Sequence, residues 1–312
     1  MNRTAWILAG GFAFLGMYGC SPSTGEGGDP SPGGSDAKAV TSEEDVLGVA
    51  KLPFPERAVE DDRVVLGAHT DLSGPAAIWG VPGRNGAQMR FDAANAAGGV
   101  HGRMIEYVVE DTQYQTPNAI RAANKLLHSD HIFAMVLALG TPQNNAVMPI
   151  QFEAGVPNVF PFSGSRSMNE PFHKLSFTQR GVYYDEIRAA VQHFHETKGR
   201  TRPCPIYQDT DYGHEILEAV IDQAAELGLE IPASSAHKKT ETEFTAAVLK
   251  LKNADCDLVL FGTIYHDTLL ILDTAKRMGW TDDDFVGNDA AYRQAIANPE
   301  SGAAEGYHVF TH

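Results

Sequence analysis

The residues with the clearest chemical potential lie at 137–147, in the stretch LALGTPQNNAV. An apolar, strand-like run ends at Gly140, and Thr141 and Pro142 follow where a helix can begin. A strand that passes into a helix here leaves backbone N–H groups and a hydroxyl facing outward, because the first N–H groups of a helix have no partner within it. The segment predicts a binding site, and the question is whether the bound group is transformed or only held.

Recognisable catalytic and metal-binding motifs are absent from the sequence. It contains no P-loop, no GxSxG elbow and no HExxH, and GGVHGR at 98–103 follows a helical pattern instead of opening one, unlike a dinucleotide fingerprint. His193 and His195 are two residues apart on a predicted helix, so they point to different faces, and we expect a solvated surface there. No loop after a predicted strand places a serine or cysteine beside a histidine. We therefore expect no enzyme, no cofactor and no metal site.

Acidic and aromatic side chains also occur in loops that follow predicted strands. Asp71, Asp209 and Asp211 are most simply explained as helix caps. Asp289, in VGNDAAY, is placed to pair with a cationic ligand group. The aromatic side chains favour a ligand held in an apolar cleft over core packing. They are Trp79, Phe162, Tyr183, Tyr184, Tyr212 and Tyr265.

Strand and helix patterns alternate from Asp61 onward. Short runs rich in β-branched residues occur at 64–68, 104–109, 132–137, 157–160, 204–207, 257–261 and 284–287. Helical patterns occur near 83–97, 117–128, 142–154, 182–198, 213–227, 242–253 and 266–278. This alternation predicts βαβ units, and hence an α/β fold of two Rossmann-like lobes whose parallel sheets have helices on both faces. Ligands of such sheets bind outside the carboxyl ends of the strands.

Several residues predict where these elements begin and end. Thr116 and Thr141 each precede a proline, which predicts a hydroxyl N-cap followed by proline at the first helical position. Gly228 predicts a left-handed helix end. Around 175–185 a strand passes through polar residues into a new helix, which predicts the crossing from the first lobe to the second.

The size and charge of the chain limit its function. Its 312 residues can form two domain-sized cores. The formal charge is 24 − 40 = −16, and no run of lysine or arginine is longer than a pair. Nucleic-acid binding relies on concentrated basic surface, so we expect no nucleic-acid partner.

The N-terminus has the pattern of an export signal. Residues 1–19 contain an early arginine and a short apolar core, too short for a membrane span. Cys20 follows a small residue, as at a bacterial lipoprotein cleavage site, which predicts a lipid anchor; an ordinary secretory signal is the alternative. Residues 21–40 hold 12 Gly, Ser or Pro out of 20 and predict a flexible tether. We expect an exported protein, in the periplasm or on the cell surface.

Cys204 and Cys256 each begin an apolar strand-like run. If the two strands are parallel neighbours, their first residues lie side by side and a disulfide can form in an oxidising compartment. Two buried free thiols are the alternative.

From residue 61 onward the chain resembles the type I periplasmic solute-binding proteins of the branched-chain amino acid (leucine/isoleucine/valine) and amide class, the receptors of ABC importers. The motifs that carry the resemblance are LSGPAAIWG (72–80), FDAANAAGGVHGR (91–103), YVVEDTQYQTPNAIRAANKLL (107–127), EAGVPNVFP (153–161), YQDTDYG (207–213) and TEFTAAVLKLKNADCDLVLFGT (242–263). In that family two hinged lobes close on a ligand.

The resemblance also implies roles for single residues. Gly140 and Thr141 would bind a ligand carboxylate, and Asp289 would receive an α-ammonium. The stretch from Phe162 to Ser165 would add main-chain and hydroxyl contacts, although Gly164 stands where the family commonly has serine or threonine, which puts the choice between Ser163 and Ser165 in doubt. Trp79 would bound the pocket from the first lobe. Tyr183, Tyr212 and Tyr265 would close over the ligand from the second lobe.

Members of this family normally continue beyond the strand that EGYHVFTH (305–312) resembles. We therefore expect a signal peptide at 1–19, a lipid-anchored tether at 20–60, a first lobe at 61–180 and a second, incomplete lobe at 181–312 of a truncated chain. A complete but shortened relative would leave a sheet edge exposed, which is an aggregation hazard.

The resemblance implies an extracytoplasmic lipoprotein that captures a small amino acid or amide-like ligand and delivers it to ABC permease subunits. A sensory receptor with the same lobes is the main alternative. A hydrolase comes third, since it would need a nucleophile and a base in the cleft.

Overall fold

The computed structural model describes residues 59–297 and 301–311. The predicted signal peptide, Cys20 and all of the tether except its last two residues lie outside these ranges. Within the described part, no helix combines the length and the apolar character needed to cross a membrane.

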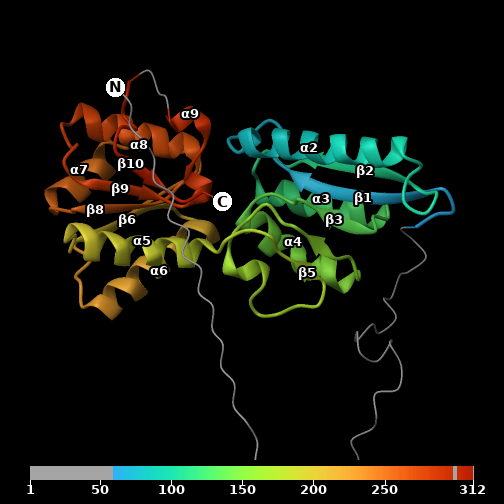
Figure 1. The fold of residues 1–312 in the computed structure, drawn as a ribbon, viewed down its shortest axis with the longest axis horizontal. Helices are drawn as coiled ribbons and strands as arrows, with labels where there is room; N and C mark the ends of the chain where they lie inside the picture. Colours follow the sequence, from blue (N-terminus) through green and yellow to red (C-terminus); the bar gives the residue numbers. More distant parts are fainter. Residues whose placement is uncertain (1–58, 298–300, 312) are drawn as a thin grey trace, which may run out of the picture. The chain divides into compact units, whose positions relative to one another are not determined.

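The first lobe is built on a five-stranded parallel sheet with the order β2-β1-β3-β4-β5. Its strands are β1 (Arg63–Thr70), β2 (Met104–Asp111), β3 (Ala134–Val136), β4 (Asn158–Val159) and β5 (Ser176–Phe177). Its helices are α2 (Ala77–Ala96), α3 (Thr116–His128), α4 (Thr141–Glu153) and the short 3₁₀ helix η1 (Arg166–Met168). The α-helices cover both faces of the sheet (Figure 1).

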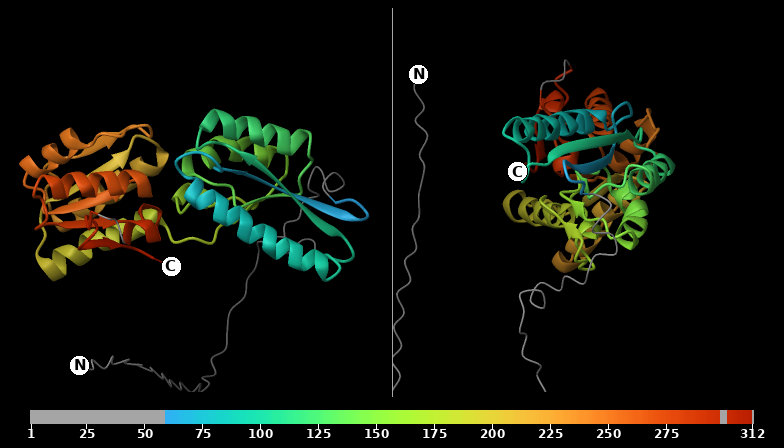
Figure 2. Two further views of the ribbon diagram at one scale, coloured as in Figure 1. Left: turned by 90° about the horizontal axis from the view of Figure 1, so that it is seen from above. Right: turned by 90° about the vertical axis from the view of Figure 1, so that its right-hand side faces the viewer.

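The second lobe has a five-stranded parallel sheet with the order β10-β9-β8-β6-β7. Its strands are β6 (Pro203–Gln208), β7 (Ser235–His237), β8 (Leu258–Gly262), β9 (Asp284–Gly287) and β10 (Tyr307–Val309). Its helices are α5 (Tyr183–Lys198), α6 (Asp211–Leu227), α7 (Thr245–Asn253), α8 (Tyr265–Arg277), η2 (Asp289–Ala291) and α9 (Gln294–Ala297). The order matches that of the first lobe strand for strand, and Figure 2 allows each sheet to be followed separately.

Each sheet therefore has its own switch point, at the same place in the strand order. It lies between the first and third strands of the lobe, and the chain builds the sheet in opposite directions on its two sides. In the first lobe this point lies between β1 and β3, and in the second between β6 and β8. The loops at the carboxyl ends of these strands contain Asp71 and Gly140 in one lobe and Asp209 and Ile264 in the other. The predicted α/β fold of two parallel-sheet lobes is confirmed.

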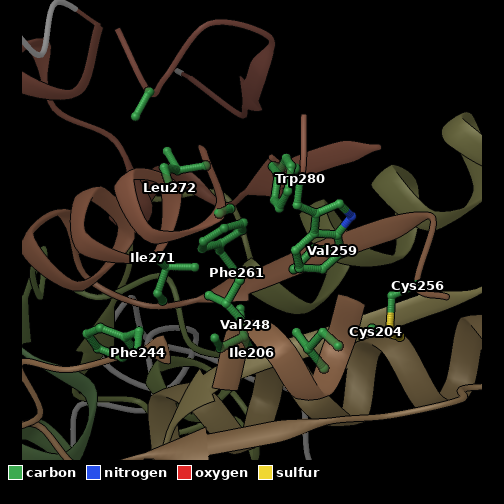
Figure 3. Packing of buried hydrophobic residues seen from close by; sticks show 14 of the residues in the cluster. Cys204, Ile206, Phe244, Val248, Cys256, Val259, Phe261, Ile271, Leu272 and Trp280 are labelled. Carbon is green, nitrogen blue, oxygen red and sulfur yellow. A yellow bond between two sulfur atoms is a disulfide. The ribbon is translucent and has the colours of Figure 1, made fainter. Parts of the chain in front are cut away.

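The central strands of the second lobe are buried along their whole length, because helices cover both sides of the sheet. Figure 3 shows the core that forms over β6 and β8, where Ile206, Val259 and Phe261 pack together. Cys204 and Cys256 are joined by a disulfide in this core, with their Cα atoms 5.8 Å apart. Of the two alternatives for the cysteines, the structure contains the disulfide.

Some helix starts differ from the sequence prediction. Neither Thr116 nor Thr141 is an N-cap: each is the first residue of its helix, and the cap residues are Gln115 and Gly140. The hydroxyl of Thr141 instead meets the hydroxyl of Ser163 at 2.8 Å. Helix α2 begins at Ala77, six residues before the predicted start, and includes Pro82 in its second turn.

Candidate ligand-binding site

A cavity of about 390 Å³, counted with its open mouth, is lined by the switch-point loops of both lobes. The first lobe contributes aromatic, apolar and helix-start residues, and the second contributes two tyrosines and two aliphatic residues. The lining residues are Ala76, Trp79, Tyr114, Leu139, Gly140, Thr141, Phe162, Arg180, Tyr183, Tyr212, Ile264 and Ala290. A mostly apolar wall with few polar groups is typical of small-molecule sites.

The N-terminus of α4 supplies the polar part of the first-lobe wall. Gly140 and Thr141 line the cavity at the residue where this helix begins. No acidic residue occupies the first turn, so nothing there offsets the partial positive charge of the helix start. The Thr141 side chain is buried, and its hydroxyl is paired with that of Ser163. This arrangement can hold a carboxylate through N–H and O–H donors.

Gly140 is required at this helix start by its backbone and its surroundings. Its φ of 100° is a conformation that L side chains rarely adopt. A Cβ atom there would overlap the side-chain oxygen of Gln143 and approach the ring of Tyr114. Gln143 is itself fixed, because its Nε2 donates to the carbonyl oxygen of Tyr114 at 2.8 Å. The site is therefore shaped before any ligand arrives.

Aromatic side chains form two pairs in the cavity wall, one from each lobe. Trp79 and Phe162 have ring centroids 6.1 Å apart in a tilted arrangement. Tyr183 and Tyr212 lie 5.3 Å apart, edge to face. Burial raises the pKa of both tyrosines, so both phenols are neutral at physiological pH. The Tyr212 hydroxyl is anchored away from the ligand space, 3.0 Å from the carbonyl oxygen of Thr263.

Arg180 is a largely buried cation in this wall, with 12% of its side chain exposed. Its guanidinium lies 4.9 Å from the ring centre of Phe162 and 5.7 Å from that of Trp79. It forms an ion pair with Asp289, which is also buried. The backbone N–H of Asp289 donates to Glu186 at 3.1 Å. The carboxylate expected to receive a ligand ammonium is thus already engaged by an arginine.

A second arginine lies over the ring of Trp79. The Arg293 guanidinium lies 3.3 Å from the ring centre, a close cation–π contact. It also donates to the carbonyl oxygen of Ile78 at 2.8 Å, which ties a second-lobe residue to α2. Burial, and then the nearby charge of Arg180, lowers the pKa of Arg293. Arg293 thus adds a second guanidinium to this part of the site, beside the Arg180–Asp289 ion pair.

A profile of the periplasmic binding protein family matches residues 63–312. The chain belongs to this family. The resemblance to the type I, branched-chain amino acid group is confirmed by relatives such as the leucine-specific-binding protein of Salmonella typhimurium. That protein is 24% identical over 263 residues, covering 84% of this chain and 70% of the relative. The members of this family are substrate-binding proteins.

Solved structures of other family members have the same fold. A substrate-binding periplasmic protein from Ralstonia solanacearum is 26% identical with a TM-score of 0.71, over 79% of this chain and 69% of that one. A fatty acid ABC transporter substrate-binding protein from Thermomonospora curvata is 25% identical with a TM-score of 0.73, over 81% of this chain and 64% of that one.

The structure brings most of the predicted family-site residues to one place. Trp79, Gly140, Thr141, Phe162, Tyr183 and Tyr212 line the cavity. Ser163 does not line the cavity, but its hydroxyl lies 2.8 Å from that of Thr141. Asp289 does not line it either, and it forms the ion pair with Arg180.

Besides Ser163 and Asp289, four predicted residues do not line the cavity: Gly164, Ser165, Tyr184 and Tyr265. The Tyr184 hydroxyl donates to Asp222 at 2.6 Å. The Ser165 hydroxyl instead donates to Glu215 of α6. Gly164 accepts the backbone N–H of Tyr183 at 2.9 Å, and a side chain at Gly164 would overlap Tyr183 and the backbone of Gly181. Tyr265, the first residue of α8, is partly buried and packs against the second-lobe core.

Sequence reasoning missed Arg180, Arg293 and Tyr114. Ala76, Leu139, Ile264 and Ala290 were also missed. Ala76 lies three residues before Trp79, and each of the others is a chain neighbour of a predicted residue. Arg180 had a usable signal, because it lies in the polar stretch that was predicted to cross between the lobes. Tyr114 and Arg293 stand in irregular segments, at φ 56° and just after η2, where no pattern indicates which way a side chain points.

Proposed function

We propose that this protein is the extracytoplasmic substrate-binding component of an ABC importer and that it holds a small carboxylate ligand in the cavity at α4. The observation that carries the proposal is the start of α4, whose Gly140 and Thr141 open onto a mostly apolar cavity. Helix N-termini favour anions, and an apolar wall selects a compact hydrocarbon body. The names of two relatives, leucine-specific and fatty acid, both denote carboxylates.

The ligand would act by favouring a closed arrangement of the lobes. The cavity wall draws on residues of both lobes, so a ligand that fills it gains its full set of contacts only when the lobes are together. A ligand that binds the closed state better shifts the equilibrium toward that state. The closed protein would then be the form that ABC permease subunits recognise. No bond needs to be made or broken.

We also propose the chain organisation that the sequence predicts. Residues 1–19 would be a signal peptide, Cys20 a lipid-bearing N-terminus and residues 20–60 a tether, with lobes at 61–180 and 181–312. The protein would therefore be anchored to a membrane while its binding lobes face the periplasm or the cell exterior. Cys20→Ala should release the protein from the membrane fraction of producing cells. Retention of the variant in that fraction would contradict the lipid anchor.

Ligand binding is tested by isothermal titration of the purified protein with a panel of small carboxylates and amides. The panel contains leucine, valine, 4-methylpentanoate, 4-methyl-2-oxopentanoate, benzoate and leucinamide. We expect at least one carboxylate to bind, and leucinamide to bind more weakly than its best carboxylate counterpart. Absence of binding by every member of the panel would overturn the proposal.

The role of the α4 start is tested by Thr141→Val, which keeps the shape of the side chain and removes the hydroxyl. We expect the affinity for the bound carboxylate to fall about fivefold to tenfold, since a hydrogen bond of this kind contributes about 1 kcal/mol. Thr245→Val is the matched control, because the Thr245 hydroxyl is exposed on α7 and bonds only to Glu243 among the described residues. Equal loss in both variants would place the carboxylate elsewhere.

A further inference from the structure

We infer that the ligand is a carboxylate without an ammonium group, such as a branched 2-oxo acid or simple branched acid, and not an amino acid. The inference rests on the proposed function and narrows its ligand class. It follows from the ion pair between Arg180 and Asp289, which joins a cavity-lining cation to the acid that an amino acid would need.

The charges at the cavity wall favour an anion, because no acidic side chain among the described residues lines it. Among the described residues that line it, Arg180 alone carries a formal charge, and that charge is positive. The start of α4 adds partial positive charge from the first lobe. Arg293, over Trp79, adds a second guanidinium. Asp289 offsets much of the Arg180 charge, but the start of α4 and Arg293 still favour a carboxylate over an ammonium.

An amino acid could reach Asp289 only by displacing Arg180. Asp289 is buried and Arg180 is largely buried, with 5% and 12% of their side chains exposed respectively. Displacement would leave the Arg180 guanidinium in a low-dielectric site without its counter-ion, which is strongly unfavourable. A ligand with the same hydrocarbon body and no ammonium avoids this loss. The pair therefore discriminates against amino acids without any steric obstacle.

Arg180 can also donate a hydrogen bond to an oxygen atom of the ligand. Its Nε–H group is buried and has no hydrogen-bond acceptor among the described residues. Buried N–H groups of this kind are normally paired, and a guanidinium can bind two carboxylates through different N–H groups. Asp289 is bonded by Nη2 of Arg180, so a ligand carboxylate in the cavity could pair with another guanidinium N–H group while Asp289 stays in place. The aromatic rings of Phe162 and Trp79 beside it suit an apolar body.

The experiment compares matched ligands by isothermal titration of the purified protein. Leucine, 4-methyl-2-oxopentanoate and 4-methylpentanoate share one hydrocarbon body and differ at the α-carbon. We expect one of the two acids without nitrogen to bind at least tenfold more tightly than leucine. Leucine binding as tightly as both acids, or more tightly, would overturn the inference while the proposed function stands. If none of the panel binds, both fall.

Two variants identify the residues responsible. Arg180→Leu should weaken the better acid at least tenfold and improve leucine, because Asp289 becomes available to an ammonium. Asp289→Asn should tighten the acid, since Arg180 then has the ligand as its main counter-ion. Arg188→Leu, an arginine of α5 paired with Glu226, is the control and should change neither affinity. Thermal unfolding of each variant checks that it is folded.

The Asp289→Asn result keeps the inference testable if Arg180→Leu does not fold. If Asp289 were the receptor of an amino acid, this variant would lose leucine binding at least tenfold and leave the nitrogen-free acids unchanged. That pattern would overturn the inference.

Discussion

Single residues in this protein fix the geometry of the binding site through contacts that leave little freedom. Gly140 holds a backbone conformation reserved for glycine, with the Gln143 side chain packed against the position where a Cβ would stand. Arg180 and Asp289 fix each other. Thr141 and Ser163 share a hydrogen bond. The cavity is thus preorganised by neighbours of the lining residues as well as by the lining residues themselves.

Gly140→Ala should destabilise the protein and impair binding. The substitution combines a positive φ with a side-chain overlap at Gln143, and strained conformations of this kind cost about 1–3 kcal/mol. We expect the free energy of unfolding, measured by urea denaturation, to fall by at least that amount. Gly98→Ala is the matched control, because Gly98 has φ 101° but no neighbouring atom within 4 Å of its Cβ position. Equal losses would mean that crowding at Gly140 contributes nothing.

At the scale of elements, β6 and β8 form the best-buried part of the second lobe and carry its covalent link. Cys204 lies in β6 and Cys256 just before β8, so the disulfide ties two neighbouring strands at their N-terminal ends. These are the opposite ends from the loops that reach the cavity. The disulfide therefore stabilises the sheet without touching the site.

Removal of the disulfide should lower stability but leave ligand affinity almost unchanged. The link closes a segment with a sequence separation of 52, for which loop entropy predicts a contribution of about 4 kcal/mol. We expect the Cys204→Ala/Cys256→Ala variant to lose about 2–4 kcal/mol of unfolding free energy in urea. Dithiothreitol should destabilise the original protein and have no effect on the variant. An unchanged midpoint in both comparisons would contradict the link.

The elements that the sequence predicted well have a strong apolar run or a periodic pattern that extends over many residues. DLVLF at 257–261 became β8, and β1 and β9 also match their predicted runs. The strand β7 was missed because SAH, at a sheet edge, has no apolar run. The start of α2 was placed too late because Pro82 is tolerated inside that helix.

Site residues that directly follow a strand could be predicted from the sequence. Site residues whose position depends on contact between distant loops could not. Gly140, Thr141 and Phe162 stand directly after strands, so topology alone brings them to the sheet edge. Arg180 and Asp289 are 109 residues apart, and their pairing requires loops of two lobes to meet. Nothing in the local sequence of either residue specifies that meeting.

At the scale of the whole molecule, polar contacts join first-lobe residues to α6 of the second lobe beside the cavity. Arg166 pairs with Glu218 at 2.6 Å, and the Asn145 side chain donates to Asp211 at 2.8 Å. Ser165 donates to the buried carboxylate of Glu215, whose pKa is raised chiefly by burial. These contacts exist only while the lobes are together, so they contribute to the closed state and indirectly to affinity.

Glu218→Gln should weaken ligand binding although Glu218 does not line the cavity. Loss of an exposed ion pair typically costs 0.2–1 kcal/mol, so we expect the dissociation constant to rise by up to about fivefold. Glu226→Gln is the control, because Glu226 pairs with Arg188 inside the second lobe and cannot favour closure. Titration calorimetry of the two variants in parallel makes the comparison. A larger effect for Glu226→Gln would show that these contacts do not stabilise closure.

Arg180 lies in the five residues between β5 and α5, the segment through which the described chain passes from one sheet to the other. The side chain that would recognise the charge of the ligand, Arg180, is therefore also part of the connection about which the lobes move. An anion that binds Arg180 therefore acts directly on that connection, without intervening side chains. We expect ligands that differ only in charge to produce different angles between the closed lobes. Transport partners would then meet a protein whose shape depends on the chemistry of the ligand.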